Sequence, residues 1–385
     1  MTAFSLKAIL RPHILTLMPY SSARDEYTGK EGVFLDANEN PLGPSLSEST
    51  AQDSQFNRYP DPHQWAIKQK LAPIKGVRPE QIFLGNGSDE PIDLLVRATC
   101  TPGSVSGDSI LIMPPTYGMY EVSATINDVA VTKVPLTPDF QVDVPAVLAA
   151  IDETTKLIWL CSPNNPSGNR LRAEDIRTVL EAAREKLVIV DEAYIDFSAD
   201  PSWTRQLDTY PNLVVLQTFS KAWGLAGLRL GMCFASEELI RVLNKIKPPY
   251  NISAPTQALA LEALDHEADK DNMVREILHE RQVLADNLRT LPSVQVIHPS
   301  DANFLLVRFA DAGSTFAQLI DHQVIVRDRS KVILCDGCLR ISVGTRAENE
   351  RLVEVLHHLG RTPTPTDLPL GTGEDATKPE LVSNA

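Results

Sequence analysis

The chain has 385 residues, of which 43% are hydrophobic and 22% are charged, and its formal net charge is −14. These proportions are typical of a globular protein with a large buried core, and the length suggests two or three domains. A nucleic-acid surface needs clustered lysine and arginine, which an acidic chain does not favour, and no apolar run approaches the ~20 residues of a membrane helix. We therefore expect neither nucleic acid nor a membrane as partner.

The two ends of the chain differ from its middle. Residues 1–24 carry basic residues and no acidic one, which is a faint organelle-targeting pattern. Arg11 and Pro12 interrupt its apolar stretch, so the favoured interpretation is an N-terminal arm, residues 1–50, that belongs to the fold. Residues 361–385 have few apolar side chains and predict a disordered tail. The five scattered cysteines, an odd number, indicate reduced thiols and a cytoplasmic protein.

Between residues 51 and 253, short apolar runs alternate with segments of helical periodicity. The runs predict seven strands, at Gln81–Gly85, Ser109–Met113, Ala130–Val134, Leu157–Ser162, Leu187–Asp191, Leu213–Thr218 and Gly231–Ala235. The intervening patterns predict helices that include Ser88–Cys100, Ala173–Lys186 and Ser236–Lys247. This alternation predicts a large α/β domain with a mostly parallel seven-stranded sheet sandwiched by helices, in which ligands bind beyond the carboxyl ends of the strands.

A different pattern begins at residue 254. Apolar residues at helical spacing predict one long helix over 254–285. Shorter strands are predicted after it, at Phe304–Phe309, Val324–Arg327, Val332–Cys335 and Leu339–Val343. Asp336–Gly337 predicts a hairpin turn between the last two of these strands. We therefore expect a smaller α+β domain over residues 254–360, joined by the N-terminal arm.

Candidate catalytic residues follow the apolar runs of the large domain. Lys221 comes after Leu213–Thr218, and Arg229 lies eight positions further on. Asn165 and Asp191 each follow an earlier run, with Tyr194 close behind. Each residue alone has an ordinary explanation, as a solvated cation, a turn or a helix cap. Together they are the groups that hold an aromatic aldehyde cofactor with a phosphate, because the amine binds the aldehyde and the acid pairs with the ring nitrogen.

A glycine-rich turn, Gly85-Asn86-Gly87-Ser88-Asp89-Glu90-Pro91, opens the first helix of the large domain. It lacks the third glycine of a dinucleotide-binding loop, because position 90 is Glu90. Ser88 is suited to cap the helix, and the free N–H groups there favour an anion. We interpret Gly87, Ser88 and Asp89 as part of a phosphate-binding cup. Further along, Tyr117 is favoured over Tyr120 as a ring that stacks on the cofactor, although the sequence does not decide between them.

In this order the motifs resemble those of the fold-type I pyridoxal-phosphate aminotransferases, and within them the histidinol-phosphate aminotransferases, over about residues 15–360. The resemblance implies that Lys221 forms the Schiff base and moves the proton, and that Asp191 pairs with the pyridine nitrogen. It implies that Tyr194 and Asn165 bind the ring oxygen. The cofactor phosphate would be held by the cup together with Thr218, Ser220 and Arg229.

The same resemblance implies how substrate is bound. Arg340 would bind a carboxylate and Arg327, helped by Tyr20, a substrate phosphate; Asn38 matches the family's substrate-binding arm. Tyr59 would reach the cofactor phosphate of the neighbouring subunit, which implies a homodimer. The implied reaction exchanges an amino group between glutamate and histidinol phosphate, in histidine biosynthesis.

Two alternative functions remain open from the sequence. A related decarboxylase that acts on a phosphorylated amino acid, such as threonine phosphate, would share most of these motifs. A non-catalytic regulator that binds pyridoxal phosphate would keep Lys221 but should carry a DNA-binding module, and none is visible. Cys335 and Cys338 have the spacing of a zinc knuckle without a second pair of ligands, so no metal is expected.

Overall fold

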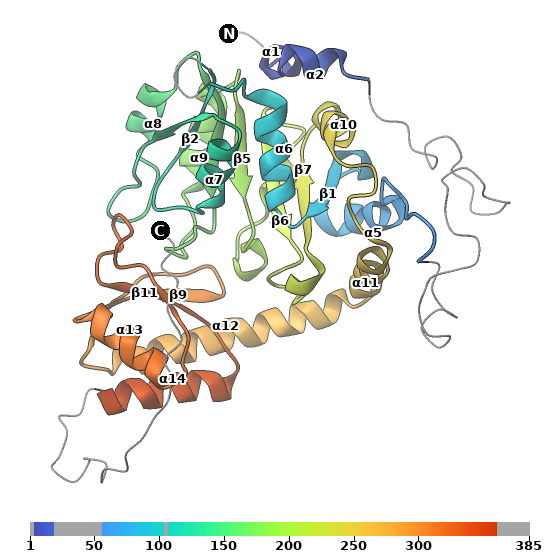
Figure 1. Ribbon diagram of the computed structural model, residues 1–385. Coiled ribbons are helices and arrows are strands. Elements are labelled where there is room, and N and C mark those ends of the chain that lie inside the picture. The colour runs from blue at the N-terminus through green and yellow to red at the C-terminus, as the bar shows by residue number, and fades with distance from the viewer. Residues whose placement is uncertain (1–3, 19–55, 104–106, 360–385) are drawn as a thin grey trace, which may run out of the picture.

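The computed structural model describes residues 4–18, 56–103 and 107–359, which form two sheets with their helices (Figure 1). The large sheet has the strand order β1-β7-β6-β5-β4-β2-β3. All its strands run parallel except β7, which is antiparallel to both of its neighbours. The strands are β1 (Ile82–Asn86), β2 (Ser109–Ile112), β3 (Ala130–Lys133), β4 (Thr155–Cys161), β5 (Leu187–Asp191), β6 (Leu213–Thr218) and β7 (Leu230–Phe234). The mostly parallel sheet of seven strands is confirmed.

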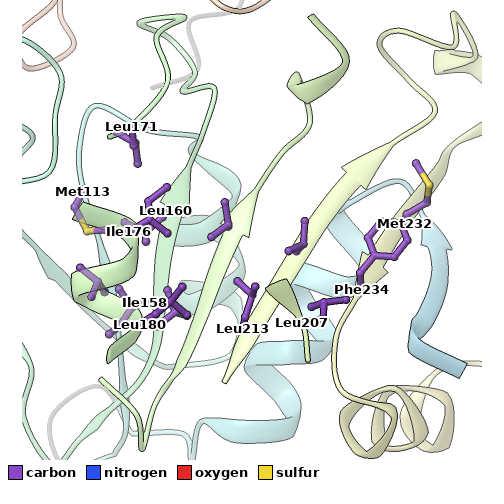
Figure 2. Close-up of a cluster of buried hydrophobic side chains, with 14 of the residues drawn as sticks. Met113, Ile158, Leu160, Leu171, Ile176, Leu180, Leu207, Leu213, Met232 and Phe234 are labelled. Atoms are coloured by element: carbon purple, nitrogen blue, oxygen red, sulfur yellow. The ribbon is translucent and has the colours of Figure 1, made fainter. Parts of the chain in front are cut away.

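Helices cover both faces of this sheet because its strands are apolar on both sides. Along β4, Ile158 and Leu160 enter one buried cluster, whereas Leu157 and Trp159 enter the other. Such alternation follows from the two-residue period of a strand. Figure 2 shows the first cluster, where Ile158 and Leu160 lie near side chains of α9. The helices around the sheet are α5 (Trp65–Lys75), α6 (Asp89–Thr99), α7 (Met119–Ile126), α8 (Val144–Ala150), α9 (Ala173–Ala182), α10 (Glu237–Ile246) and α11 (Ala254–Asp265).

The smaller sheet has the order β10-β11-β9-β8 and is antiparallel. Its core is formed with α12, α13 and α14, and Figure 1 shows α12 as a long helix that connects α11 to this sheet. The elements are α12 (Glu267–Arg289), β8 (Val294–Ile297), β9 (Phe304–Phe309), α13 (Ala312–Asp321), β10 (Arg327–Asp328), β11 (Cys338–Ser342) and α14 (Arg346–Leu359). Short 3₁₀ helices complete the described chain at η1 (Pro79–Gln81), η2 (Ile195–Phe197), η3 (Trp203–Gln206) and η4 (Ala226–Leu228).

The N-terminal arm packs on the large sheet, not on the smaller one. Helix α1 (Leu6–Ile9) buries Leu6 and Ile9 in the cluster that includes α6 and α10, and Ile14 of α2 (Pro12–Thr16) is also buried. The backbone N–H of Arg11 donates to Ala98 at 3.0 Å, and Lys245 Nζ donates to the carbonyl of Ile14 at 2.8 Å. The expected joining of the arm to the smaller domain is therefore wrong for residues 4–18. Residues 19–55 and the tail from 360 lie outside the described chain.

Three further expectations about the C-terminal part, for a helix, a strand and a hairpin turn, are wrong. The long helix over 254–285 is two helices, because His266 takes ψ 33° and leaves the helical conformation between α11 and α12. The segment Val332–Cys335 is a series of turns and not a strand, with Leu334 at φ +63°. Strand β10 instead pairs directly with β11, so Asp336–Gly337 forms a turn before β11 and not a hairpin between two strands.

Within the described residues, no helix has both the length and the apolar character that crossing a bilayer requires.

Candidate active site

A cavity of about 870 Å³ opens where the carboxyl ends of the parallel strands face the smaller sheet. Because β7 runs against the others, its first residues also lie at this edge, and Arg229 just before β7 is brought to the same place. Most of the site residues expected from the sequence line the cavity: Ser88, Asp89, Tyr117, Asn165, Asp191, Tyr194, Thr218, Ser220, Lys221, Arg229, Arg327 and Arg340.

Lys221 projects into the cavity from the turn that follows β6. The turn is anchored in the core, because Phe219 and Trp223 on either side of Lys221 are buried and their ring centres lie 5.3 Å apart. The Lys221 ammonium lies 5.5 Å from the centre of the Tyr194 ring. Desolvation lowers the pKa of Lys221, and the positive charges of Arg340 and Arg229 lower it further. A lysine with a lowered pKa is more often neutral, which is the form that attacks a carbonyl and accepts a proton.

Asp191 is the last residue of β5 and is only 3% exposed. Its Oδ2 accepts a hydrogen bond from the Tyr120 hydroxyl at 2.6 Å, and its Oδ1 accepts one from the Ala193 N–H at 3.1 Å. Burial raises the pKa of Asp191 to about 6, although both hydrogen bonds act in the opposite direction. The carboxylate is thus held in place, and a cationic group in the cavity would balance its buried charge.

Tyr120 contacts a candidate site residue, and the sequence did not reveal this contact. It is fully buried and stacks on Trp159 with ring centres 4.6 Å apart, as expected for a core side chain. Its hydroxyl nevertheless bonds Asp191, which lies 71 residues away in the chain. No local motif could indicate this pair, because only the packing of α7 against the sheet brings them together. Tyr117 is the tyrosine that lines the cavity, and its hydroxyl donates to Asp89 at 3.0 Å.

A cup for an anion forms between the start of α6 and the turn before β7. Arg229 Nη1 lies 3.5 Å from the Ser220 hydroxyl, and Nη2 lies 3.6 Å from Asp89. Gly87 adopts φ +67°, and a Cβ atom there would lie 2.5 Å from Arg229 Nη2, so a side chain would displace the guanidinium. Ser88 does not cap the helix as expected, because its hydroxyl is directed to the Gln217 carbonyl at 3.3 Å.

The smaller sheet supplies the opposite wall of the cavity. Arg340 Nη1 donates to Asn165 Oδ1 at 2.5 Å, and its guanidinium carbon lies 5.2 Å from the Phe304 ring centre. Arg327 is directly opposite Arg340 in the β10–β11 pair. Arg329 also lines the cavity and was missed from the sequence. Its position two residues after Arg327 is the signal that could have indicated it, because alternate residues of a strand share a face.

Four of the expected site residues are not among those that line this cavity: Gly87, which contacts Arg229 from behind the cup, and Tyr59, Tyr20 and Asn38. Tyr59 is 50% exposed and stacks on Tyr250, with ring centres 4.3 Å apart, and it is not among the residues that line the cavity. Tyr20 and Asn38 lie outside the described residues. Their expected contacts with the cofactor or substrate therefore stay predictions.

Comparison with known proteins agrees with this geometry. The model of the family "Aminotransferase class I and II" matches residues 30–356. A protein of Cytophaga hutchinsonii named histidinol-phosphate aminotransferase is 57% identical over 354 residues, which cover 92% of this chain and 99% of that protein. A relative of the same name from Parabacteroides distasonis is 52% identical, with the same coverage of both chains. The solved structure of histidinol-phosphate aminotransferase from Sinorhizobium meliloti in complex with pyridoxal-5'-phosphate is similar with a TM-score of 0.71 at 26% identity, covering 93% of this chain and 99% of that one. The chain belongs to the class I and II aminotransferase family.

Proposed function

We propose that the protein is a pyridoxal-phosphate enzyme that transfers an amino group between glutamate and histidinol phosphate, in histidine biosynthesis. One observation carries the proposal most strongly. Lys221 with its lowered pKa and the buried Asp191 face the same cavity as the anion cup around Arg229. The names of the relatives that match over nearly the whole chain support the choice of substrate.

The residues of the cavity fit the chemical groups of this cofactor. The cup offers hydroxyl groups, the Arg229 guanidinium and the N–H groups of the first turn of α6, which have no partner within the helix. The carboxylate of Asp89 contributes indirectly, since it holds Tyr117 and Arg229. Asn165 and Tyr194 line the same cavity as Lys221 and Asp191, and they offer an amide and a hydroxyl. The tight contact at Gly87 keeps the cup open for a phosphate.

The chain supplies the proton transfers and the fixed charges. Bound here, pyridoxal phosphate supplies an electron sink for the negative charge that develops at the substrate carbon. Lys221 binds the cofactor aldehyde, and as a neutral amine it moves the proton to and from that carbon. Asp191 keeps the ring nitrogen protonated, because the Tyr120 hydroxyl and the Ala193 N–H stabilise its ionised form.

Substrate recognition is assigned to the wall made by the smaller sheet. Arg340 binds the carboxylate of glutamate, and Arg327 binds the phosphate of histidinol phosphate. A guanidinium is suited to both groups, since it forms paired charge-assisted hydrogen bonds with planar or tetrahedral oxyanions. In this proposal residues 51–253 bind the cofactor and residues 254–360 present the arginines.

The proposed working unit is a cytoplasmic homodimer in which Tyr59 serves the cofactor phosphate of the partner subunit. Tyr59 is half-exposed and does not line the cavity of its own chain, which leaves it accessible to a neighbour. Val122 and Ile126 lie one turn apart on α7, are exposed, and follow the rim of the cavity at Met119. An apolar stripe of this kind beside a site is suited to a protein partner.

The substrate experiment is a titration of the purified, cofactor-loaded protein followed by absorbance. Histidinol phosphate should convert the aldehyde form of the cofactor to its amine form, and 2-oxoglutarate should restore the aldehyde form. Threonine phosphate serves as the comparison, with carbon dioxide release measured in parallel. A protein that releases carbon dioxide from threonine phosphate and leaves histidinol phosphate unchanged would refute the proposed substrate.

The dimer is tested by mixing two inactive variants, Lys221→Ala and Tyr59→Ala. In a mixed dimer, one site combines an intact Lys221 with an intact Tyr59 only if Tyr59 serves the other subunit. Activity that appears on subunit exchange therefore supports the shared site, and light scattering should give the mass of a dimer. An active monomer, or a mixture without recovered activity, would contradict this part of the proposal.

A further inference from the structure

Three guanidinium groups of the smaller sheet face the cavity together. Arg327 and Arg340 are directly opposite each other in the β10–β11 pair. The pairing continues past β10, because the N–H of Arg329 donates to the carbonyl of Cys338 at 3.0 Å. Side chains two residues apart on a strand, and side chains directly opposite in an antiparallel pair, share one face. The backbone pairing itself therefore directs all three toward the cavity that they line.

These positive charges have little compensation within the protein. Like charges directly opposite on a sheet destabilise it. In the described part of the chain, no carboxylate lies within ion-pair distance of Arg327, Arg329 or Arg340. Asp328 lies between the first two, but its Oδ1 accepts hydrogen bonds from the N–H and hydroxyl of Ser330 at 2.8 and 2.6 Å. The chain has a net charge of −14, so carboxylates are plentiful elsewhere in it. Three arginines without a carboxylate partner on one face therefore indicate a site for an anion.

We propose that Arg329 is a second phosphate-binding arginine beside Arg327 and that it determines the preference for a phosphorylated substrate. This inference rests on the proposed function, because it takes a phosphate monoester as the substrate. Such a monoester carries about −1.5 to −2 charges at pH 7 and three acceptor oxygens, more than one guanidinium satisfies. A carboxylate carries one charge and two oxygens, and Arg340 alone matches it. Two arginines on one strand face therefore favour phosphate over carboxylate.

The side chain of Arg329 is well placed for this role. It is half-buried at the cavity wall, and its backbone, not its guanidinium, makes the contacts that extend the sheet. Desolvation lowers the pKa of Arg329, and the charges of Arg340 and Arg327 lower it further, which places the three groups within electrostatic reach of one another. An arginine stays charged at neutral pH despite such a shift. Replacing the guanidinium should thus relieve repulsion in the free protein and weaken only the binding of the anion.

The test measures the two half-reactions separately by the absorbance of the bound cofactor, one with histidinol phosphate and one with glutamate. In Arg329→Gln, the apparent Kd for histidinol phosphate should rise about 10- to 100-fold, the size of one lost charge-assisted hydrogen bond. The limiting rate should be unchanged, and the Kd for glutamate should change less than about 3-fold, as for a screened charge. Arg329→Lys should restore part of the affinity. The matched control is Arg351→Gln, an exposed arginine on α14 that pairs with Glu354.

Inorganic phosphate provides a second readout that does not depend on histidinol phosphate as substrate. It should inhibit the glutamate half-reaction of the loaded wild-type enzyme, and the inhibition constant should rise in Arg329→Gln by a similar factor. If histidinol phosphate is no substrate of the wild type, the proposed function fails, and the phosphate titration still decides the role of Arg329. Equal losses for glutamate and histidinol phosphate, or unchanged phosphate inhibition in Arg329→Gln, would overturn the inference.

Discussion

The two walls of the cavity differ in how completely their charged groups are satisfied. On the wall made by the large sheet, Asp191 is buried and accepts two hydrogen bonds, and Arg229 lies beside Asp89 and Ser220. On the wall made by the smaller sheet, Arg327 and Arg329 have no ion pair within the described residues, and Arg340 bonds only a neutral amide oxygen. The first wall is organised before any ligand binds, as catalytic groups need to be. In the proposed function the second is completed by the anion that it binds, so catalysis and recognition are assigned to different sheets.

The largest effect is expected on the catalytic wall, from Lys221→Ala. Removing the amine that is proposed to bind the cofactor and move the proton should lower kcat by at least about 10⁴-fold, the upper range for a general acid–base group. Borohydride treatment of the loaded wild type, followed by peptide mass mapping, should place a pyridoxyl group on Lys221. Lys133→Ala, an exposed lysine paired with Glu121, is the matched control. A label on another lysine would remove the basis for assigning chemistry to this wall.

The burial of Asp191 predicts a pH dependence of stability in the cofactor-free protein. Its pKa is about 6 in the folded chain against an ordinary value of 3.8. A carboxyl with a raised folded pKa binds its proton more tightly when folded, so its contribution to stability is present below pH 4 and is lost as the pH rises through 6. The difference corresponds to at most about 3 kcal/mol in the free energy of unfolding.

Urea unfolding of wild type and Asp191→Asn between pH 4 and pH 8 measures this contribution. The wild type should lose stability over that range relative to the variant. Burial also raises the pKa of Glu192, to about 7. Glu192 changes the pH dependence of stability equally in both proteins, so its contribution cancels in the comparison. If the free energy of unfolding changed with pH equally in wild type and Asp191→Asn, the Asp191 carboxylate would not be destabilised by burial.

On the recognition wall, Arg327→Ala should raise the KM for histidinol phosphate by about 30- to 150-fold, which is ~2–3 kcal/mol for a charge-assisted contact. The KM for unphosphorylated histidinol should change little, because histidinol lacks the phosphate that Arg327 is proposed to bind. Steady-state kinetics with both substrates measure the difference. Equal increases in KM for both substrates would mean that Arg327 has a structural role. They would also contradict the assignment of substrate recognition to the smaller sheet.

The smallest expected effect is that of Tyr120→Phe, which removes one hydroxyl without changing the packing against Trp159. Losing one hydrogen bond to a carboxylate should lower kcat about 5- to 10-fold, or ~1–1.4 kcal/mol. It should also raise the pKa of Asp191, since the Tyr120 bond favours the ionised form, and so move the acid limb of the kcat–pH profile to higher pH. Tyr210→Phe, whose hydroxyl contacts Glu181 near the surface, is the control. An unshifted profile would limit Tyr120 to a packing role.

The catalytic wall was the more predictable from sequence, and the reason is local. Strand ends in a parallel sheet meet at one edge, so motifs that follow apolar runs identify residues that converge. This is why Asp191 and Lys221 were placed in one site despite their separation in the chain. The recognition wall was predicted only in part, because Val332–Cys335 was taken for a strand. Arg329 was missed, although it lies two residues after Arg327 and its N–H pairs with the carbonyl of Cys338.

By itself the sequence determined the layered α/β arrangement and the chemical groups of the cofactor site, because hydrophobic periodicity and short motifs are local properties of the chain. Only the tertiary structure decided that Tyr120 bonds Asp191, that residues 4–18 pack on the large sheet, and that three arginines share one face. Each of these depends on which elements pack together across long separations in the chain. Such contacts are fixed by the packing of whole elements, and among these residues only Arg329 has a local signal, its position two residues after Arg327.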